Sequence, residues 1–314
     1  MANSFLKPEI ISRAMLGLLE RDIVLPRFVW RDAEADFRGR VGPKGDTVTI
    51  RVPARTAAHE YAWRNDRSSG ITMDELTEDS VDVKLTHDVY NGIPITDEEL
   101  TLDIGDFGSQ VLAPQTRAVA EYLENLIAAE MTGATYANTL TVDTSDPYKT
   151  LVDARALLNK ANVPFADRFC VIGADVESAM LKSDHLANAD TAGDSQALRD
   201  ASVGRMAGFN VFVTNSLPAN VGFAFHRTAY PAVFRAPVVP DGATFGQSAA
   251  YGGIAMRWIK DYDATHLQDR SIVSTFFGVT HVTDNVVNPA DPDSTAADIF
   301  VRSVKLAMPE DTEE

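Results

Sequence analysis

The chain has 314 residues, a formal net charge of −17, 45% hydrophobic residues and 23% charged residues. Such a composition is typical of a globular protein with a large core, and the length allows one large domain or two ordinary ones. A net acidic chain without a basic block is poorly suited to direct DNA recognition, because DNA affinity rests chiefly on Lys and Arg that neutralise phosphates. The single cysteine, Cys170, excludes an intrachain disulfide and is expected to be a small core residue.

The first 45 residues are predicted to form an N-terminal arm. Residues 8–20 place apolar side chains at helical spacing, which predicts a short amphipathic helix starting near Pro8. Residues 25–30 and the glycines between Gly39 and Gly45 then predict an extended segment. The N-terminus has no apolar run suitable for a signal peptide, and no stretch approaches the roughly 20 apolar residues of a membrane span. We therefore expect a soluble protein made in the cytoplasm.

Residues 46–90 predict a β-hairpin with a long charged tip, here called the flap. Residues 47–52 and 81–86 alternate apolar and polar side chains, so each strand has one apolar face. The connection between them, residues 53–80, holds too few apolar residues for a core. A two-stranded ribbon is marginal in water, and a structureless connection beyond about 15 residues is usually functional or disordered. Two interpretations remain open: a flap that becomes ordered on a neighbouring subunit, and a disordered surface insertion.

The charge changes sign along the chain. Residues 1–67 carry 12 Lys and Arg against 9 Asp and Glu, whereas residues 68–106 carry only Lys84 against 11 acids. The arm and flap of one copy can therefore meet the acidic segment of another, with charge setting register more than affinity. Ordinary solvated surface is the alternative interpretation. The candidate intersubunit contact residues are Arg55, Tyr61, Trp63, Arg64, Arg67, Ile71, Asp74, Glu75, Glu78, Asp79, Asp97, Glu98 and Glu99.

A long helix is predicted after the flap. Thr96 is a capping residue with acids in the turn that follows it, and a helical pattern continues from about Phe107. Pro114 should start or kink the main run, and Gly133 should end it. About 20 helical residues span about 30 Å, the width of a small domain. The predicted apolar face consists of Val111, Leu112, Ala118, Val119, Tyr122, Leu123, Leu126 and Ile127, with Arg117, Glu121, Glu124 and Asn125 opposite.

From residue 147 the pattern alternates between helices and strands, which predicts an α+β domain with a mixed or antiparallel sheet. The predicted helices cover residues 148–160 and 175–181. The predicted strands cover residues 168–172, 209–214, 221–226, 251–262, 271–282 and 299–306. Residues 309–314 form an acidic tail that is expected to fray.

Sequence motifs typical of enzymes and metal sites are mostly missing. The sequence has no phosphate-binding glycine loop, zinc-protease motif or nucleophile elbow, and its six histidines lack ligand spacing. The acids at 261, 263 and 269 can in principle bind a cation, but turn formation is the favoured interpretation. Carboxylates at 78–79, 97–99 and 103 are expected to solvate a surface. We therefore predict no catalytic residue, no metal and no cofactor.

The order of elements resembles the major capsid protein of tailed double-stranded-DNA bacteriophages, which has the HK-ninety-seven-type fold. Local sequence also resembles the P-twenty-two coat branch of that family. The segments that carry this resemblance are residues 45–48 with 52–53, 163–164 with Arg168, 208–211 continuing to 215–218, and 257–263. The match spans nearly the whole chain, and its strength lies in the order of individually weak motifs.

The resemblance implies a domain organisation. Residues 1–45 would be the N-terminal arm, 46–90 the E-loop, and 91–146 the peripheral domain with the spine helix. Residues 147–270 would form the axial domain, and 271–314 would hold strands that return to the peripheral domain, followed by the acidic tail. Unlike some members of the P-twenty-two branch, the sequence leaves no room for an inserted domain between residues 209 and 262.

The resemblance also implies partners. Copies of the chain would assemble as hexamers and pentamers into an icosahedral shell in the cytoplasm of a bacterial host, enclosing DNA without sequence-specific binding and without a membrane. A separate scaffolding protein is expected because no N-terminal segment is long enough to be a built-in scaffold, and portal and decoration proteins are further expected partners. The alternatives are an encapsulin-like nanocompartment shell and a soluble flap-bearing hydrolase or binding protein.

Overall fold

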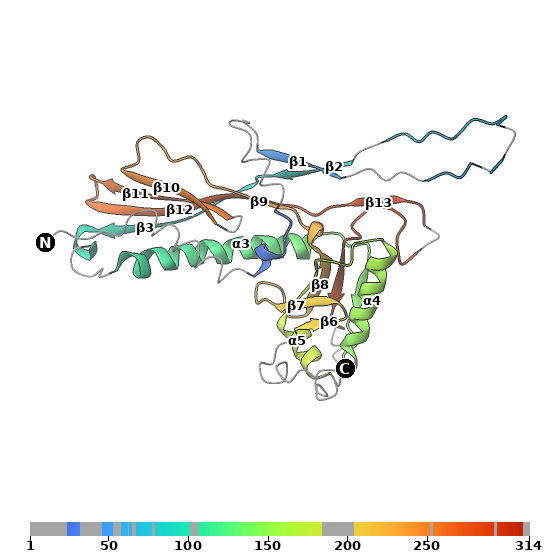
Figure 1. Ribbon diagram of the computed structural model, residues 1–314. Helices are drawn as coiled ribbons and strands as arrows, with labels where there is room; N and C mark the ends of the chain where they lie inside the picture. The colour runs from blue at the N-terminus through green and yellow to red at the C-terminus, as the bar shows by residue number, and fades with distance from the viewer. Residues whose placement is uncertain are drawn as a thin grey trace.

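The computed structural model describes residues 24–31, 46–52, 58–61, 63–64, 67–76, 79–100, 106–183, 204–251, 254–291 and 294–309. It confirms the predicted α+β class, because helices pack against two main sheets of five and six strands (Figure 1). A two-stranded ribbon and its tip extend away from both sheets. The amphipathic helix predicted over residues 8–20 lies outside the described residues, as does most of the predicted acidic tail.

The elements are numbered as in Figure 1. The helical elements are η1 (Leu25–Arg27), η3 (Gly108–Leu112), α3 (Ala113–Gly133), α4 (Pro147–Lys160), α5 (Ala174–Leu181) and η5 (Arg227–Ala229). The strands are β1 (Thr47–Val52), β2 (Asp79–Lys84), β3 (His87–Thr96), β4 (Thr139–Thr141), β5 (Arg168–Ile172), β6 (Arg205–Met206), β7 (Phe209–Val213), β8 (Val221–His226), β9 (Ala232–Arg235), β10 (Phe245–Tyr251), β11 (Ile254–Asp263), β12 (Gln268–Val279), β13 (Asp284–Val286), β14 (Ala297–Ile299) and β15 (Ser303–Ala307). Within the described part of the chain, no helix is long and apolar enough to cross a membrane.

The five-stranded sheet is antiparallel and packs against α3. Its order is β10-β11-β12-β3, and β9 pairs with the end of β12. The fully buried Gln115 joins helix and sheet, because its side-chain amide donates to the carbonyl of Ser271 at 2.8 Å and accepts from the Ser271 hydroxyl at 2.7 Å. The Trp258 indole donates to the same hydroxyl at 3.0 Å. Every polar group in this contact is thus partnered, which allows a polar residue on the buried face of α3.

The six-stranded sheet is mixed and has the order β4-β15-β8-β5-β7-β6. Strands β5 and β7 run parallel, as do β15 and β4, whereas β8 is antiparallel to both of its neighbours. Helices α4 and α5 pack against this sheet and bury Leu151, Leu158 and Val176. Cys170 lies in β5 and is completely buried, which confirms its predicted role; burial raises the pKa of its thiol to about 12.

One aromatic cluster lies where the two sheets meet. The hydroxyls of Tyr136 and Tyr230 are 2.6 Å apart, and Tyr230 donates to the hydroxyl of Ser303 at 3.1 Å. The rings of Phe225 and Phe300 meet the Tyr230 ring edge-on, at centroid distances of 5.3 and 5.4 Å. Burial holds the pKa of both tyrosines well above the ordinary range, so the phenols remain neutral. A shared, hydrogen-bonded core therefore joins the two sheets.

The boundaries of the long helix match the prediction closely. The helical run is continuous from the π-helical turn η3 into α3, so Pro114 lies where the π-helix changes to an α-helix, and the helix ends at Gly133. Thr96 and Glu99 form the predicted cap: the Glu99 carboxylate accepts from the Thr96 N–H at 2.9 Å, and the Thr96 hydroxyl accepts from the Glu99 N–H at 3.3 Å.

The predicted buried face of α3 is partly wrong. Glu124, expected at the surface, is only 6% exposed, whereas Ala118 and Tyr122, expected in the core, are exposed. The buried face includes Gln115, Thr116, Ala120 and Glu124, so it lies further round the helix than the apolar pattern indicates. Apolar periodicity misses this face because polar residues with internal partners occupy part of it.

The prediction of an extended arm at residues 25–30 is also wrong. Residues 25–27 form the 3-10 turn η1, and Leu25, Phe28 and Val29 are buried in the main core. Trp30 bonds to the chain at Tyr230 and Ala232 with two backbone hydrogen bonds of 2.9 Å. This part of the arm therefore rests on its own subunit.

Several strands differ from the prediction. β3 and β9 were not predicted. β3 contains Gly92 and Pro94, which are both unusual inside a strand. Pro94 is tolerated because β3 is an edge strand. The strand predicted over residues 251–262 corresponds to β11, and β10, which precedes it and pairs with it as a hairpin, was not predicted. The strand predicted over 299–306 divides into β14 and β15.

The predicted division at residue 270 does not follow the sheets. β10 and β11 were placed in the 147–270 unit, yet they pair with β12 and lie in the five-stranded sheet. β15 was predicted to return to the 91–146 unit, yet it pairs with β8 in the six-stranded sheet. The predicted division followed local sequence patterns, which do not show which distant strands pair with one another.

Candidate intersubunit contact surface

The flap has a regular base formed by β1 and β2. The two strands are antiparallel, in a register that places Val48 opposite Val83 and Ile50 opposite Val81. The Thr49 hydroxyl donates to the Asp82 carboxylate across the ribbon at 2.6 Å. The predicted hairpin is therefore confirmed, with its second strand beginning at residue 79 instead of 81.

The apolar face of the base rests on its own subunit. Val48, Ile50 and Val83 are buried in a cluster with Val233 of β9, and Trp30 and Leu85 pack against this cluster. The expectation that the hairpin has nothing within its own chain to lie on is therefore wrong for the base. The unpredicted strand β9 supplies the missing surface.

A glycine in β12 permits the close seating of the base. An added Cβ at Gly278 would lie 2.1 Å from the carbonyl oxygen of Lys84, so only glycine fits without moving the backbone. Next to this contact, the Thr86 N–H donates to the carbonyl of Phe277 at 3.1 Å, and the Leu85 N–H donates to that of Asp46 at 2.7 Å. The base is thus fixed at the point where the flap leaves the sheet.

The flap tip, residues 53–78 between β1 and β2, is held by contacts between its two sides. His59 Nε2 and Asp74 Oδ1 are 2.7 Å apart, and the Tyr61 hydroxyl donates to the carbonyl of Ser69 at 2.6 Å. The guanidinium of Arg67 lies over the Tyr61 ring, 5.0 Å from its centroid. Figure 1 shows the tip reaching far beyond the body on the side away from β10 and β11. These contacts shape the tip without covering it.

Large apolar side chains of the tip face solvent. Trp63 is 88% exposed and Met73 81%, and Ile71 and Leu76 are also exposed. Several large exposed apolar side chains within one short segment are what an interaction site would present. Trp63 and Ile71 were predicted contact residues, whereas Met73 and Leu76 were missed. A signal for them was present in the sequence, because they continue the apolar positions after Ile71 in a segment without a core.

The structure brings some candidate residues together and separates others. Tyr61, Trp63, Arg64, Arg67, Ile71, Asp74 and Glu75 all lie on the tip, and Asp79 lies in β2 opposite Val52. Arg55 and Glu78 lie outside the described residues. Asp97, Glu98 and Glu99 form an exposed turn after β3, at the end of the five-stranded sheet away from the flap. A single chain therefore does not bring the tip and the acidic turn together.

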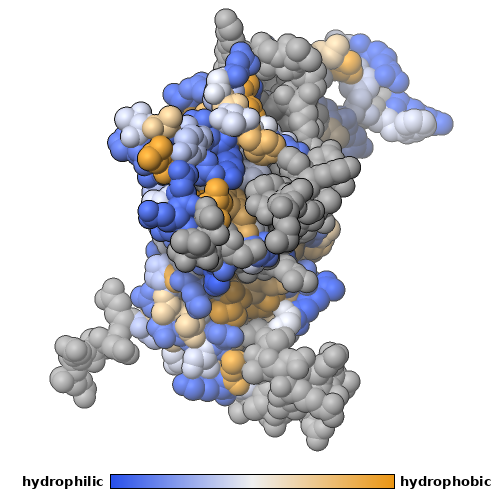
Figure 2. Space-filling model, turned by 90° about the vertical axis from the view of Figure 1, so that its left-hand side faces the viewer, coloured by the Kyte–Doolittle hydropathy of each residue, from blue (hydrophilic) through white to orange (hydrophobic). Residues whose placement is uncertain are grey.

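The acidic turn belongs to a hydrophilic end of the molecule. Figure 2 looks onto this end, and hydrophilic residues dominate the upper part of the view, with hydrophobic residues in small patches. The Tyr262 hydroxyl donates to the Asp97 carboxylate at 3.0 Å, and this bond raises the pKa of Tyr262. The acids here are therefore partly engaged by neighbouring strands.

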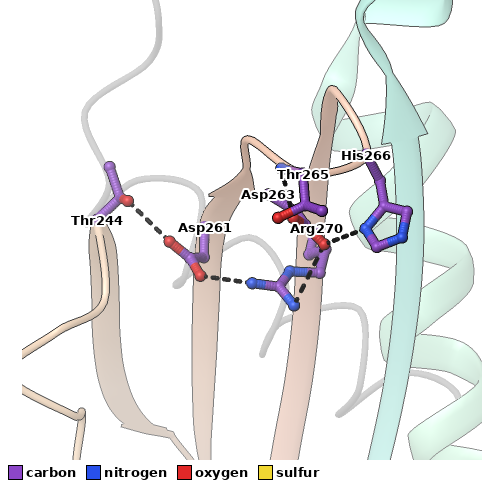
Figure 3. A network of polar contacts seen from close by, with 6 residues as sticks. All are labelled: Thr244, Asp261, Asp263, Thr265, His266 and Arg270. Carbon is purple, nitrogen blue, oxygen red and sulfur yellow. Dashed lines mark hydrogen bonds and ion pairs between the residues drawn. The ribbon is translucent and has the colours of Figure 1, made fainter.

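The acids of the β11–β12 hairpin support the turn interpretation (Figure 3). Asp261 accepts from the Thr244 hydroxyl and from Arg270, each at 2.9 Å, and Asp263 accepts from the Thr265 N–H at 3.0 Å and contacts His266 at 2.9 Å. These hydrogen bonds lower the pKa of both carboxyl groups. Asp269 pairs with Lys260 at 2.9 Å. Among the residues that the structure describes, no group of three or more His, Cys, Asp or Glu side chains is placed to hold a metal.

A groove between β3 and α3 was not predicted. It has a volume of about 360 Å³ and is lined by residues that include Tyr90, Asn91, Ala118 and Tyr122. Tyr90 is 72% exposed and Tyr122 53%, so two rings stand at the surface of the five-stranded sheet and its helix. Tyr122, predicted to be in the core because it lies at helical spacing with apolar residues, thus lines a surface groove.

Comparisons with solved structures agree on the fold. The chain is similar to a structure titled Mycobacterium phage Che8, with a TM-score of 0.61, 18% identity and 90% of each chain covered. It is also similar to the capsid of Ralstonia phage GP4 (TM-score 0.58, 10% identity, 91% of this chain and 89% of that one). A virus-like particle from Pyrococcus furiosus matches with a TM-score of 0.51 and 12% identity over 95% of this chain and 98% of that one. No match was found among curated proteins.

A family model decides the assignment. The model described as phage capsid protein matches residues 80–275, which is more than half of the chain and runs from β2 into β12. This range contains α3, most of the five-stranded sheet and much of the six-stranded sheet. The chain belongs to the phage capsid protein family and is a major capsid protein with the HK-ninety-seven-type fold.

Proposed function

We propose that copies of this chain assemble as hexamers and pentamers into an icosahedral shell that encloses a double-stranded DNA genome, with the flap tip of each copy bound to its neighbour. The observation that carries this proposal is the exposure of Trp63, Ile71, Met73 and Leu76 on a tip that extends beyond its own body. Family membership supports the shell itself. The protein acts by assembly and performs no catalysis.

The elements are assigned as follows. Residues 46–86 form the E-loop and α3 is the spine helix. The five-stranded sheet with α3 is the peripheral domain, and the six-stranded sheet with α4 and α5 is the axial domain. Support comes from the order of elements and from the packing of α3 on β3 and β12. In this assignment the chain enters the axial domain after α3 and returns to it with β15.

Apolar burial supplies the energy of the flap contact. Each Å² of apolar surface removed from water contributes about 25 cal/mol before ordering and association costs are deducted. The free energy contributed by one flap contact is modest on this scale. A closed shell repeats it for every copy, so that many weak contacts together hold the particle.

The shell is held without covalent cross-links through flap lysines. The connection from residue 53 to residue 80 contains no lysine, the residue that some members of this fold use to cross-link neighbours. Denaturing gels of mature particles are expected to give bands of single-subunit size. A ladder of multimers would refute this part of the proposal.

Assembly takes place in the host cytoplasm with a separate scaffolding protein, and portal and decoration proteins complete the particle. The net charge of −17 supports an inner wall that repels packaged DNA weakly and does not bind it by sequence. Retention of DNA by disassembled subunits at physiological salt would contradict the role assigned to the charge.

Negative-stain microscopy of the expressed chain, with and without a candidate scaffolding protein, tests the proposal. We expect uniform closed shells only when the scaffold is present, and nucleic acid in particles purified from infected cells. Protein cargo in those particles would instead favour a nanocompartment shell. A discrete small oligomer under all conditions would overturn the assembly proposal.

A further inference from the structure

Residues 24–31, here called the N-terminal segment, lie where the parts of the subunit meet. Leu25 is 1% exposed and Val29 2%, and both belong to the core cluster that also contains residues of α3, β8 and β12. A segment with η1 as its only helical turn is thus buried as deeply as the elements around it. Its interactions, and not its own secondary structure, hold it in place.

One side of the segment contacts the six-stranded sheet. The Phe28 ring lies between two rings of this sheet, with centroid distances of 4.7 Å to Phe169 of β5 and 4.3 Å to Phe212 of β7. Such aromatic pairs contribute beyond the area that they bury. Phe28 therefore depends on the position of β5 and β7, and they depend on Phe28.

The other side contacts the flap base. Trp30, two residues further along, packs against the cluster of Val48, Ile50 and Val83. Its backbone bonds to Tyr230 and Ala232 fix it beside β9, which carries the remaining member of that cluster. Phe28 and Trp30 thus touch different parts of the subunit through one short piece of chain.

Glu124 of α3 fixes the start of the segment. Its carboxylate accepts from the backbone N–H groups of Val24 and Leu25 and, at 2.8 Å, from the hydroxyl of Thr214, which follows β7. Thr214 also accepts from the Ser216 N–H at 3.2 Å, so its hydroxyl is oriented toward the carboxylate. One buried side chain on the long helix therefore holds both the N-terminal segment and the end of β7.

From this arrangement we infer that the N-terminal segment couples the flap base to the six-stranded sheet within one subunit, with Glu124 as the residue that positions it. Displacing the segment from either side removes support from the other. Because such coupling is reciprocal, a flap that binds a neighbour also biases the six-stranded sheet of its own chain. This last consequence rests on the proposed function, whereas the coupling itself is a property of a single chain.

Hydrogen exchange of the full-length protein, followed by peptide mass spectrometry, tests the coupling. Phe28→Leu keeps an apolar residue but removes both ring contacts with β5 and β7, and it leaves Trp30 intact. We expect exchange to become about tenfold faster in β7 and also in β1 and β2, which Phe28 does not touch. Thr214→Val, which removes one donor to Glu124, should give the same pattern with a smaller amplitude.

Leu158→Ala is the matched control. Leu158 is fully buried on α4 in the other core cluster and does not touch the N-terminal segment. This variant should speed exchange around α4 and leave β1 and β2 unchanged. Faster exchange in β7 of Phe28→Leu without a change in β1 and β2 would overturn the coupling, as would an equal rise in every element including α4. Neither result would bear on assembly, which microscopy tests separately.

Discussion

The base and the tip of the flap are parts of one hairpin with opposite surroundings. The base buries Val48, Ile50 and Val83 against its own subunit, whereas the tip exposes Trp63 and Met73 almost completely. The base therefore contributes to the stability of the single chain, whereas the contribution that we propose for the tip is to contacts between chains. One ribbon can serve both purposes because the apolar side chains of its base are covered within the subunit and those of its tip are not.

An aspartate introduced at the base and at the tip should show the difference between the two parts of the ribbon most clearly. Val83→Asp places a charge in a site that is 0% exposed and is expected to destabilise the subunit by about 3 kcal/mol. Met73→Asp on the tip should change the free energy of unfolding by no more than about 0.5 kcal/mol. Urea unfolding measures both, and equal losses would show that base and tip do not differ.

The seating of the base gives a second test. Gly278→Ala forces a Cβ against the carbonyl of Lys84 and should cost about 1 to 3 kcal/mol while shifting the flap base. Gly242→Ala is the control, because nothing lies within 4 Å of the Cβ that would be added there. A Gly278→Ala variant with unchanged stability and unchanged exchange in β1 and β2 would mean that the base is not held at this point.

Glu124 is expected to make the stability of the subunit depend on pH. Burial, strengthened by the charge of Glu121 on the same helix, raises the pKa of Glu124 in spite of its hydrogen bonds. A raised folded-state pKa means that this group's contribution is fully present below the unfolded pKa and is lost as pH rises through the folded pKa. Glu124→Gln should flatten this dependence of unfolding free energy on pH above the ordinary glutamate range. An identical pH profile in the variant would contradict the assignment.

The rate of thiol labelling should distinguish the buried interior from the exposed tip. Cys170 is fully buried with a raised pKa, so native protein should label with a thiol reagent about 100-fold more slowly than denatured protein. A cysteine introduced as Met73→Cys should label immediately in the free subunit and become protected on assembly. Rapid labelling of native Cys170, measured in the unchanged chain, would contradict the packing of β5.

Local patterns in the sequence were sufficient for elements whose stabilising contacts are local. The cap at Thr96, the helix end at Gly133, the alternating strand β1 and the apolar, buried strands β5 and β8 all follow from short-range rules. The interpretation of the acids near residue 263 as turn residues rested on similar short-range chemistry, and Asp263 accepts from the Thr265 N–H within the turn.

Features that depend on distant partners could not be predicted in this way. The burial of Glu124 depends on Thr214 and on the backbone at Leu25, and the seat of the flap base depends on β9. Met73 and Leu76 were missed for a different reason. Their apolar character was visible in the sequence, but their exposure was known only once the tip was seen to extend away from the body.

We propose that the tip acts between chains and not within one. A variant with Trp63, Ile71, Met73 and Leu76 all changed to Ser tests it directly, with assembly followed by microscopy and folding by urea unfolding. The account predicts a subunit with an unchanged unfolding midpoint that forms no closed shells under conditions where the unchanged chain does. Normal shells from this variant, or loss of the folded subunit, would contradict the account.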